Sequence, residues 1–414
     1  MAKRNHRYYV LLHFAIILAV TFTLIGCGGG TPKSPATTPG KGKVKKTAVI
    51  QKVSLVSDLI QGRKVFEDKN CSKCHSVFGQ EEKVAPTLQT TRIRGSFLDI
   101  FSNIWNHAPA MAVQMRKEGL PRPQFGTSEL NHVVSFIYML PYLGKPGSKV
   151  QGEKLLEEKA CLICHTIGGI GKKGGISLDV LAHYESQVVL AQRMWNHGPV
   201  MLSQMISTGT PVPKFSGNDM NDLFATLSSE GKNGKERKIS LGVGDAEKGE
   251  RIFKEKKCNA CHSLFGQGGK EGPDLGKTIS QANVASLTAL LWNHAAEMQK
   301  TFREKKLPWP YFSETEMSDL VVFLYSLNYQ EKNGDPKGGK KAFEKNTCAD
   351  CHFQSDADKE KLVKRVSGLN PVQFATVLWN HIPKMEAKMV SQAVPWPRLS
   401  GKEMRDILAY FQSL

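Results

Sequence analysis

Three repeated features predict an all-α fold made of four tandem units. A Cys-x-x-Cys-His motif begins at residues 71, 161, 258 and 348, so its copies are 90, 97 and 90 residues apart. A Trp-Asn-His-x-x-x-Met sequence follows every copy, and each unit then closes on a stripe of apolar residues with helical spacing. No stretch of useful length alternates apolar and polar residues, as a strand would. Self-similarity at a fixed period indicates repeated domains, and each is expected to be a small helical bundle.

The chain of 414 residues is longer than a single hydrophobic core usually supports. The predicted organisation is a signal peptide at 1–26, a flexible tether at 27–53, and units one to four at 54–146, 147–238, 239–331 and 332–414. Short linkers near 144–147 and 328–335 favour close packing of the units. The longer stretch 228–242, rich in Lys and Gly, predicts a separation into two halves of two consecutive units each.

Each unit begins with a predicted short helix that leads into the Cys-x-x-Cys-His motif. This helix is rich in Lys and Glu and carries a glycine nine residues before the first cysteine, at Gly62, Gly152, Gly249 and Gly339. In the last two units the helix has a recognisable start. Asp245 is the expected N-cap of one, and Asp335, followed by Pro336 at the first helical position, is the expected N-cap of the other.

Each unit ends with a predicted closing helix that follows a Pro-x-Pro pair. The last of these helices places Met404, Ile407, Leu408 and Phe411 on one face, the spacing of a helix with one buried side. Ser313 with Glu316, and Ser400 with Glu403, predict capping boxes at the starts of the last two closing helices. The Pro-x-Pro pairs are Pro121 and Pro123, Pro211 and Pro213, Pro308 and Pro310, and Pro395 and Pro397.

The Cys-x-x-Cys-His motif is the attachment sequence of c-type haem, in which two thiols form thioethers and the histidine binds the iron. A zinc site needs two further ligands for each pair, and a redox dithiol does not need the histidine every time. Four copies in register with other repeated features therefore predict four covalently attached haems. The predicted haem-binding residues are Cys71, Cys74 and His75; Cys161, Cys164 and His165; Cys258, Cys261 and His262; and Cys348, Cys351 and His352.

The N-terminal residues predict export from the cytoplasm. Residues 1–7 are basic, residues 8–25 are almost continuously apolar, and Gly26 and Cys27 follow. This is the pattern of a secretory signal. The run from Leu24 to Cys27 resembles a bacterial lipobox, which implies cleavage before Cys27 and a lipid anchor on its sulfur. An uncleaved transmembrane anchor is the alternative, and both place the rest of the chain outside the cytoplasm.

The formal charge of +18 does not indicate nucleic-acid binding. Lys and Arg are spread along the whole chain rather than clustered among aromatic residues. Two interpretations remain: a solvated basic surface, or a surface that docks an acidic redox partner.

From about residue 54 to 414, each unit resembles a class I, monohaem-type cytochrome c domain. Domains of that family carry Asn-Gly-x-x-x-Met late in the sequence, and its methionine is the sixth iron ligand. Here Asn and Met keep that spacing, although histidine replaces the glycine. The resemblance implies a tetrahaem lipoprotein whose sixth ligands are Met111, Met201, Met298 and Met385.

Other residues compete for the sixth position. The histidine of Trp-Asn-His lies one helical turn before the methionine, so both are able to face the ring. These histidines are His107, His197, His294 and His381, and a second methionine stands at Met115, Met205 and Met389 but not in unit three. The family also places a proline near the proximal histidine. Pro86 and Pro273 match it, whereas unit two has Ile176 and unit four has a shorter loop, so four unequal haem potentials are expected.

The expected function is electron transfer rather than catalysis. An iron with two protein ligands has no open position for a substrate, and four such irons on one chain are able to form a relay. The alternative is a haem peroxidase or nitrogen-oxide reductase with one open iron, for which unit four is the first candidate. A redox or gas sensor ranks last, because no signalling domain is apparent. The expected partners are redox proteins or respiratory complexes of the bacterial cell envelope, facing the periplasm or the cell exterior.

Overall fold

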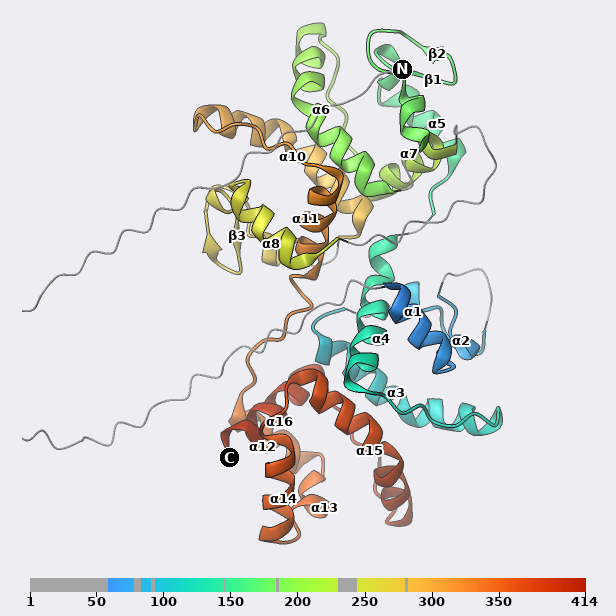
Figure 1. Ribbon diagram of the computed structural model, residues 1–414, viewed down its shortest axis with the longest axis vertical. Helices are drawn as coiled ribbons and strands as arrows, with labels where there is room; N and C mark the ends of the chain where they lie inside the picture. The colour runs from blue at the N-terminus through green and yellow to red at the C-terminus, as the bar shows by residue number, and fades with distance from the viewer. Residues whose placement is uncertain are drawn as a thin grey trace, which may run out of the picture. The chain divides into compact units, whose positions relative to one another are not determined.

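The computed structural model describes residues 59–77, 83–90, 94–144, 146–183, 186–229, 244–279 and 282–414. The predicted signal peptide, the tether and Cys27 lie outside these residues. Residues 48–414 group into one compact unit (Figure 1). None of the helices in the described part is both long and apolar enough to cross a membrane.

Each unit is built from three principal helices, as the repeats predict. The first helices are α1 (Leu59–Asp68), α5 (Lys149–Glu158), α8 (Ala246–Glu255) and α12 (Pro336–Lys345). The long helices, which carry Trp-Asn-His, are α3 (Phe97–Lys117), α6 (Gln187–Thr208), α10 (Val284–Glu304) and α15 (Pro371–Ser391). The closing helices are α4 (Thr127–Met139), α7 (Gly217–Ser229), α11 (Glu314–Ser326) and α16 (Gly401–Ser413).

Shorter elements connect these helices. The cysteine motifs form single turns at α2 (Cys71–Cys74), η3 (Cys161–Ile163), η5 (Cys258–Ala260) and α13 (Cys348–His352). The loops contain η1 (Leu88–Thr90), η2 (Pro141–Leu143), η4 (Leu178–His183) and α9 (Leu275–Thr278). In unit four, where the sequence is shorter, an additional helix α14 (Asp356–Val366) takes the place of the loop.

Two small hairpins correct the expectation that the chain has no strands. β1 (Thr166–Ile167) pairs with β2 (Ile170–Gly171), and β3 (Ser263–Leu264) pairs with β4 (Gln267–Gly268), both antiparallel. The two-residue turns are Gly168-Gly169 and Phe265-Gly266, all four with positive φ, which suits the tightest hairpin turns. Two-residue strands are too short for alternation to show in the sequence.

The repeated glycine permits close contact between the first helix and the closing helix of the same unit. A Cβ added at Gly249 would lie 2.0 Å from the Asp319 carbonyl oxygen of α11, and one at Gly152 would lie 2.1 Å from that of Asp222. Real side chains do not approach that closely, so only glycine fits at this crossing. The first and closing helices thus form the base on which each cysteine motif rests.

The predicted helix starts are confirmed. The side chain of Asp245 accepts hydrogen bonds from the backbone N–H groups of the first turn of α8, and Asp335 does the same for α12. Ser313 and Glu316 form a capping box at α11, and Ser400 and Glu403 form one at α16. These local signals satisfy N–H groups that have no partner inside the helix.

The units pair out of chain order, so the predicted halves of consecutive units are wrong. Helix α3 of unit one packs on α15 and α16 of unit four, and α6 of unit two packs on α10 and α11 of unit three. Units one and three then meet through their closing helices. The hydroxyls of Tyr138 and Tyr325 each donate to the other residue's carbonyl oxygen, at 2.7 and 3.0 Å. The length of a linker limits how far apart two consecutive units lie, but it does not determine which units pack together. The prediction from linker length was therefore wrong.

A buried carboxylate joins three units. Glu331, at the end of unit three, accepts a hydrogen bond from the backbone N–H of Leu98 in unit one at 2.5 Å. It also lies 3.4 Å from the Arg405 guanidinium of unit four, which in turn pairs with Asp99 at 2.9 Å. Burial raises the pKa of Glu331 to about 7, more than the Leu98 N–H and Arg405 lower it.

This raised pKa predicts a pH-dependent stability. Because the folded state holds the proton more tightly than the unfolded chain, the stabilisation is complete below the ordinary pKa of 4.5 and is lost as the pH rises through about 7. Relative to Glu331→Gln, which cannot ionise, the natural protein should lose about 3 kcal/mol of unfolding free energy over that range. Denaturant unfolding of both proteins at several pH values measures this. A difference that is independent of pH would contradict the prediction.

Candidate functional site

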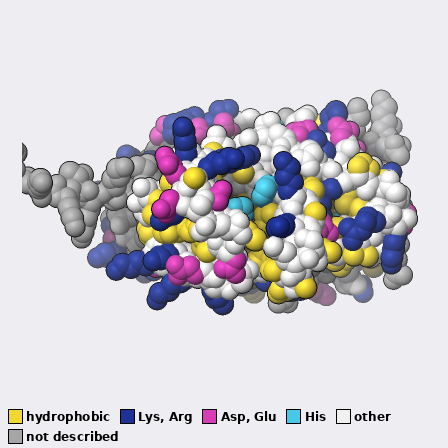
Figure 2. Space-filling view, turned by 90° about the horizontal axis from the view of Figure 1, so that it is seen from below, with side chains coloured by type: hydrophobic (Ala, Val, Ile, Leu, Met, Phe, Trp, Pro, Cys, Tyr) yellow, Lys and Arg dark blue, Asp and Glu magenta, His cyan; other side chains and the backbone are white. Residues whose placement is uncertain are grey.

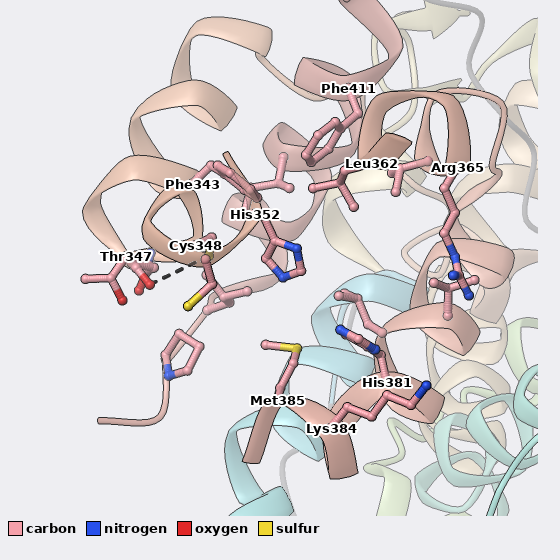
Figure 3. Close-up of a pocket in the computed structure, with 18 of the residues that line it drawn as sticks. Phe343, Thr347, Cys348, His352, Leu362, Arg365, His381, Lys384, Met385 and Phe411 are labelled. Carbon is pink, nitrogen blue, oxygen red and sulfur yellow. Dashed lines mark hydrogen bonds between the residues drawn. The ribbon is translucent and has the colours of Figure 1, made fainter. Parts of the chain in front are cut away.

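A cavity of about 510 Å³ lies in unit four between the cysteine motif and the long helix. Cys348 and His352 stand on one wall, and His381 and Met385 of α15 stand on the other (Figure 3). Cys351 also lines the cavity. Apolar side chains such as Phe343, Leu362 and Phe411 line much of the rest. The structure therefore brings the residues predicted for the fourth site together around one apolar space.

The paired cysteines are free thiols rather than disulfides in all four units. Burial raises the pKa of Cys71, Cys161 and Cys348 to about 11 and that of Cys258 to about 12. A redox dithiol needs a thiol pKa lowered toward neutrality, so these values speak against that alternative. The residue before each first cysteine has a left-handed backbone with φ near 60°: Asn70, Ala160, Lys257 and Thr347.

In three units, the histidine that follows the cysteine pair is held by a hydrogen bond between its Nδ1 atom and a backbone carbonyl oxygen. Nδ1 lies 3.1 Å from the Pro86 carbonyl oxygen for His75, 2.9 Å from that of Ile176 for His165, and 3.0 Å from that of Pro273 for His262. A ring that donates from Nδ1 keeps a lone pair on Nε2 for a metal. The prediction that Pro86 and Pro273 lie near this histidine is confirmed. The carbonyl makes the contact, which is why Ile176 serves equally.

Unit four departs from this arrangement. Because α14 replaces the loop, no carbonyl oxygen within the described residues pairs with the His352 ring, which lies 6.5 Å from the Phe343 ring. Burial lowers the pKa of His352, and burial also lowers that of His75. Both rings therefore favour the neutral form that binds a metal.

The long helix presents both competing ligands to the same space. The rings of His75 and His107 have centroids 6.3 Å apart, and those of His165 and His197 are also 6.3 Å apart. The centroids of His352 and His381 are 6.0 Å apart. The methionines predicted as sixth ligands are partly buried and pack against the hydrophobic cores: Met111, Met201, Met298 and Met385.

The tryptophan of Trp-Asn-His binds the paired unit rather than its own. Its indole N–H donates to the carbonyl oxygen of the second proline in the partner's Pro-x-Pro segment, at 2.7 to 2.9 Å. The four pairs are Trp105 with Pro397, Trp379 with Pro123, Trp195 with Pro310, and Trp292 with Pro213. Trp105 of unit one thus also lines the cavity of unit four.

The asparagine of the same motif makes a second exchange. Asn196 donates from Nδ2 to the Phe312 carbonyl oxygen at 2.8 Å and accepts at Oδ1 from the Phe312 N–H at 3.0 Å. The other three asparagines form the same two bonds: Asn106 with Leu399, Asn293 with Phe215, and Asn380 with Phe125. Sequence alone gave these tryptophans and asparagines no such role.

In two of the long helices, a proline leaves one backbone carbonyl oxygen without its helical N–H partner. A tryptophan of the paired unit donates a hydrogen bond to that oxygen instead. Pro199 has no N–H for the Trp195 carbonyl oxygen four residues earlier, and the Trp309 indole of unit three donates to that oxygen at 3.3 Å. Pro109 and Trp396 repeat this at Trp105. At Pro383 of unit four the facing residue is Arg122, which lies 5.6 Å from the centre of the Trp379 ring and donates to Glu386 at 2.9 Å instead of to the Trp379 carbonyl oxygen.

Unit three lacks both halves of this combination. Ala296 stands where the other long helices have proline, and the facing residue between Pro211 and Pro213 is Val212, which has no side-chain donor. The sequence carries this match twice, at Pro199 with Trp309 and at Pro109 with Trp396. The match becomes readable only when the pairing of units is known.

The surroundings fit a covalently attached haem. Each site offers two free thiols and one histidine, and the fourth adds an apolar cavity that takes a large flat ring. A haem bound there would supply an iron that carries one electron. The chain would hold it by the cysteines and by the histidine Nε2.

Comparison with known proteins identifies two of the units. Residues 59–140 and 246–328 each match the sequence model of the cytochrome c family, so units one and three are similar to cytochrome c domains. Such domains bind covalent c-type haem and imply haem-based electron transfer, and their family consists generally of electron carriers. No curated protein matches the chain significantly.

The pairing of proline and donor predicts a thermodynamic coupling. Trp309→Phe should destabilise the protein by about 1–3 kcal/mol, because it leaves the Trp195 carbonyl oxygen buried without a donor. In a Pro199→Ala background, the restored helical N–H should reduce that cost by about 1 kcal/mol. Denaturant unfolding of the four proteins measures the coupling. The matched control replaces Pro383, which does not face Trp309, and should show no coupling. Equal costs in both backgrounds would contradict the prediction.

Proposed function

We propose that the chain is a tetrahaem electron carrier of the bacterial cell envelope. The observation that carries the proposal is the recurrence of one site in all four units. Units two and four, which lie outside the segments matched by the family model, have the same free thiol pair and the same histidine facing a histidine of the long helix. Their helices also pack in the same arrangement as those of units one and three.

The contacts between units support a relay with a particular order. Units four and one exchange tryptophan and asparagine hydrogen bonds, and so do units three and two. Units one and three meet through tyrosines, with the Tyr138 and Tyr329 ring centroids 4.7 Å apart. The proposed sequence of sites is therefore four, one, three, two, rather than the order along the chain. The four potentials are expected to differ, since within the described part of the chain His352 lacks the carbonyl partner that the other three histidines have.

The surface around the sites suits an acidic redox partner. Figure 2 shows histidine side chains at the surface among hydrophobic side chains, with Lys and Arg side chains nearby. Around the fourth cavity the basic residues are Lys361, Arg365, Lys384 and Lys388, against a single acidic residue, Asp358. This local excess of positive charge favours docking of an acidic redox protein or respiratory complex. The anchor on Cys27 belongs to the same proposal and keeps the carrier at the membrane.

Haem counting tests the proposal. The purified protein should contain four haems per chain, because each unit has a complete cysteine pair and histidine. Pyridine haemochrome absorbance and intact mass measure the number. The variant Cys161→Ala with Cys164→Ala should contain three haems, and so should Cys348→Ala with Cys351→Ala. Two haems in the natural protein, unaffected by either variant, would confine haem to units one and three.

Carbon monoxide separates the carrier from the alternative haem enzyme. A peroxidase or nitrogen-oxide reductase needs one iron with an open or easily displaced position, whereas a carrier has two protein ligands on every iron. The fully reduced protein should show no carbon monoxide difference spectrum. A change that amounts to one haem in four would favour the enzyme, and its loss in Cys348→Ala with Cys351→Ala would place the open iron in unit four.

A further inference from the structure

Two facing histidines recur in three of the four sites. In units one and two the ring of the motif histidine and the ring of the long-helix histidine have centroids 6.3 Å apart, with interplanar angles of 64° and 69°. In unit four the distance is 6.0 Å. The same distance between ring centroids thus occurs in three units whose loops differ, including unit four with its additional helix. This repetition indicates a common constraint rather than chance packing.

The spacing suits two imidazoles that share one metal. A metal–imidazole bond is about 2.0 Å long and the ring centroid lies about 1.1 Å behind the nitrogen, so two such rings on opposite sides have centroids about 6.2 Å apart. In units one and two the Nδ1 atom of the motif histidine is turned to a backbone carbonyl, at 3.1 and 2.9 Å. Its Nε2 therefore points away from that carbonyl and is free to bind.

Unit three lacks the pair. Among the described residues, His262 and His294 form no such ring contact, and the Nδ1 atom of the exposed His294 lies 2.9 Å from the Leu290 carbonyl oxygen of its own helix. The three helices with facing histidines are also the three with a proline two residues after the histidine, at Pro109, Pro199 and Pro383. Unit three has Ala296 there. A helix interrupted by proline bends, which changes how the residues beside it are presented.

We infer that His107, His197 and His381 are the sixth iron ligands of units one, two and four, and that only unit three uses its methionine, Met298. The inference rests on the proposed function, since it assumes a haem in each unit. It replaces Met111, Met201 and Met385 as ligands. All four methionines, Met298 included, lie one turn further along the helix and pack against the cores, so the facing histidine rings decide the assignment. The expected protein therefore has three bis-histidine haems and one histidine–methionine haem.

Ferric-state spectroscopy of the purified full-length holoprotein tests the ligands directly. A methionine sulfur on ferric haem gives a weak charge-transfer absorption at the red end of the visible spectrum, and a bis-histidine haem does not. The intensity should correspond to one haem in four and should vanish in Met298→Leu. It should persist in Met201→Leu, the matched control. An intensity of four haems, or a loss of one haem's share in Met201→Leu, would overturn the inference.

Histidine variants give the complementary result. Near-infrared magnetic circular dichroism should report three bis-imidazole haems in the natural protein. His197→Ala should reduce that to two, and His294→Ala should leave it at three. No change in His197→Ala, or a loss in His294→Ala, would overturn the assignment.

Redox titration supplies a third readout. Methionine ligation raises a haem potential relative to histidine, so the third haem should be the highest-potential component. The variant Cys258→Ala with Cys261→Ala should remove that component, whereas loss of a lower component would count against the inference. Haem content is measured first on every protein. A shortage of haem in the natural protein refutes the proposed function, whereas four haems with four methionine signatures refute only the ligand assignment.

Discussion

The exchange of Trp-Asn-His hydrogen bonds between paired units is the interaction on which the rest of the structure depends. A unit by itself would expose its indole N–H, its asparagine amide and its Pro-x-Pro segment to water. In the pair these groups are bonded to one another, and a buried polar group that loses its partner is costly, so each unit of a pair stabilises the other. The long helix that makes this exchange also carries the histidine and methionine of the candidate site. The position of those side chains is therefore set partly by another unit.

Much of the local structure was predictable because its causes are local. Caps such as Asp245 and Ser400 act within one turn, and the apolar stripe of a closing helix follows from helical periodicity. The repeated glycine predicted a special position but not its reason, the carbonyl oxygen of a closing helix only 2.0 Å from the missing Cβ of Gly249. The cysteine motif is recognisable without the fold, since its residues are adjacent in the chain, and the attachment chemistry that it indicates stays a prediction.

The sequence leaves open both the pairing of units and the choice of sixth ligand, for the same physical reason. All four Pro-x-Pro segments offer the same backbone groups, so nothing at Pro310 or Pro397 alone says which tryptophan it accepts. Likewise His107 and Met111 lie on neighbouring turns of one helix, and periodicity places both near the ring. Only the direction of the side chain separates them, and that depends on tertiary contacts of the helix such as the packing of Trp105 against Trp396.

The pairing out of chain order also affects the order in which contacts between units are able to form as the chain emerges. Trp195 meets Pro310 across 115 residues of sequence, whereas Trp105 meets Pro397 across 292. Shorter loops close at a lower entropic cost, and chains emerge from the N-terminus first. Units two and three are thus able to join while the chain is still incomplete. Unit one, although made first, waits with an exposed tryptophan until the last residues arrive, so a chain cut short before Pro397 leaves it permanently without its partner.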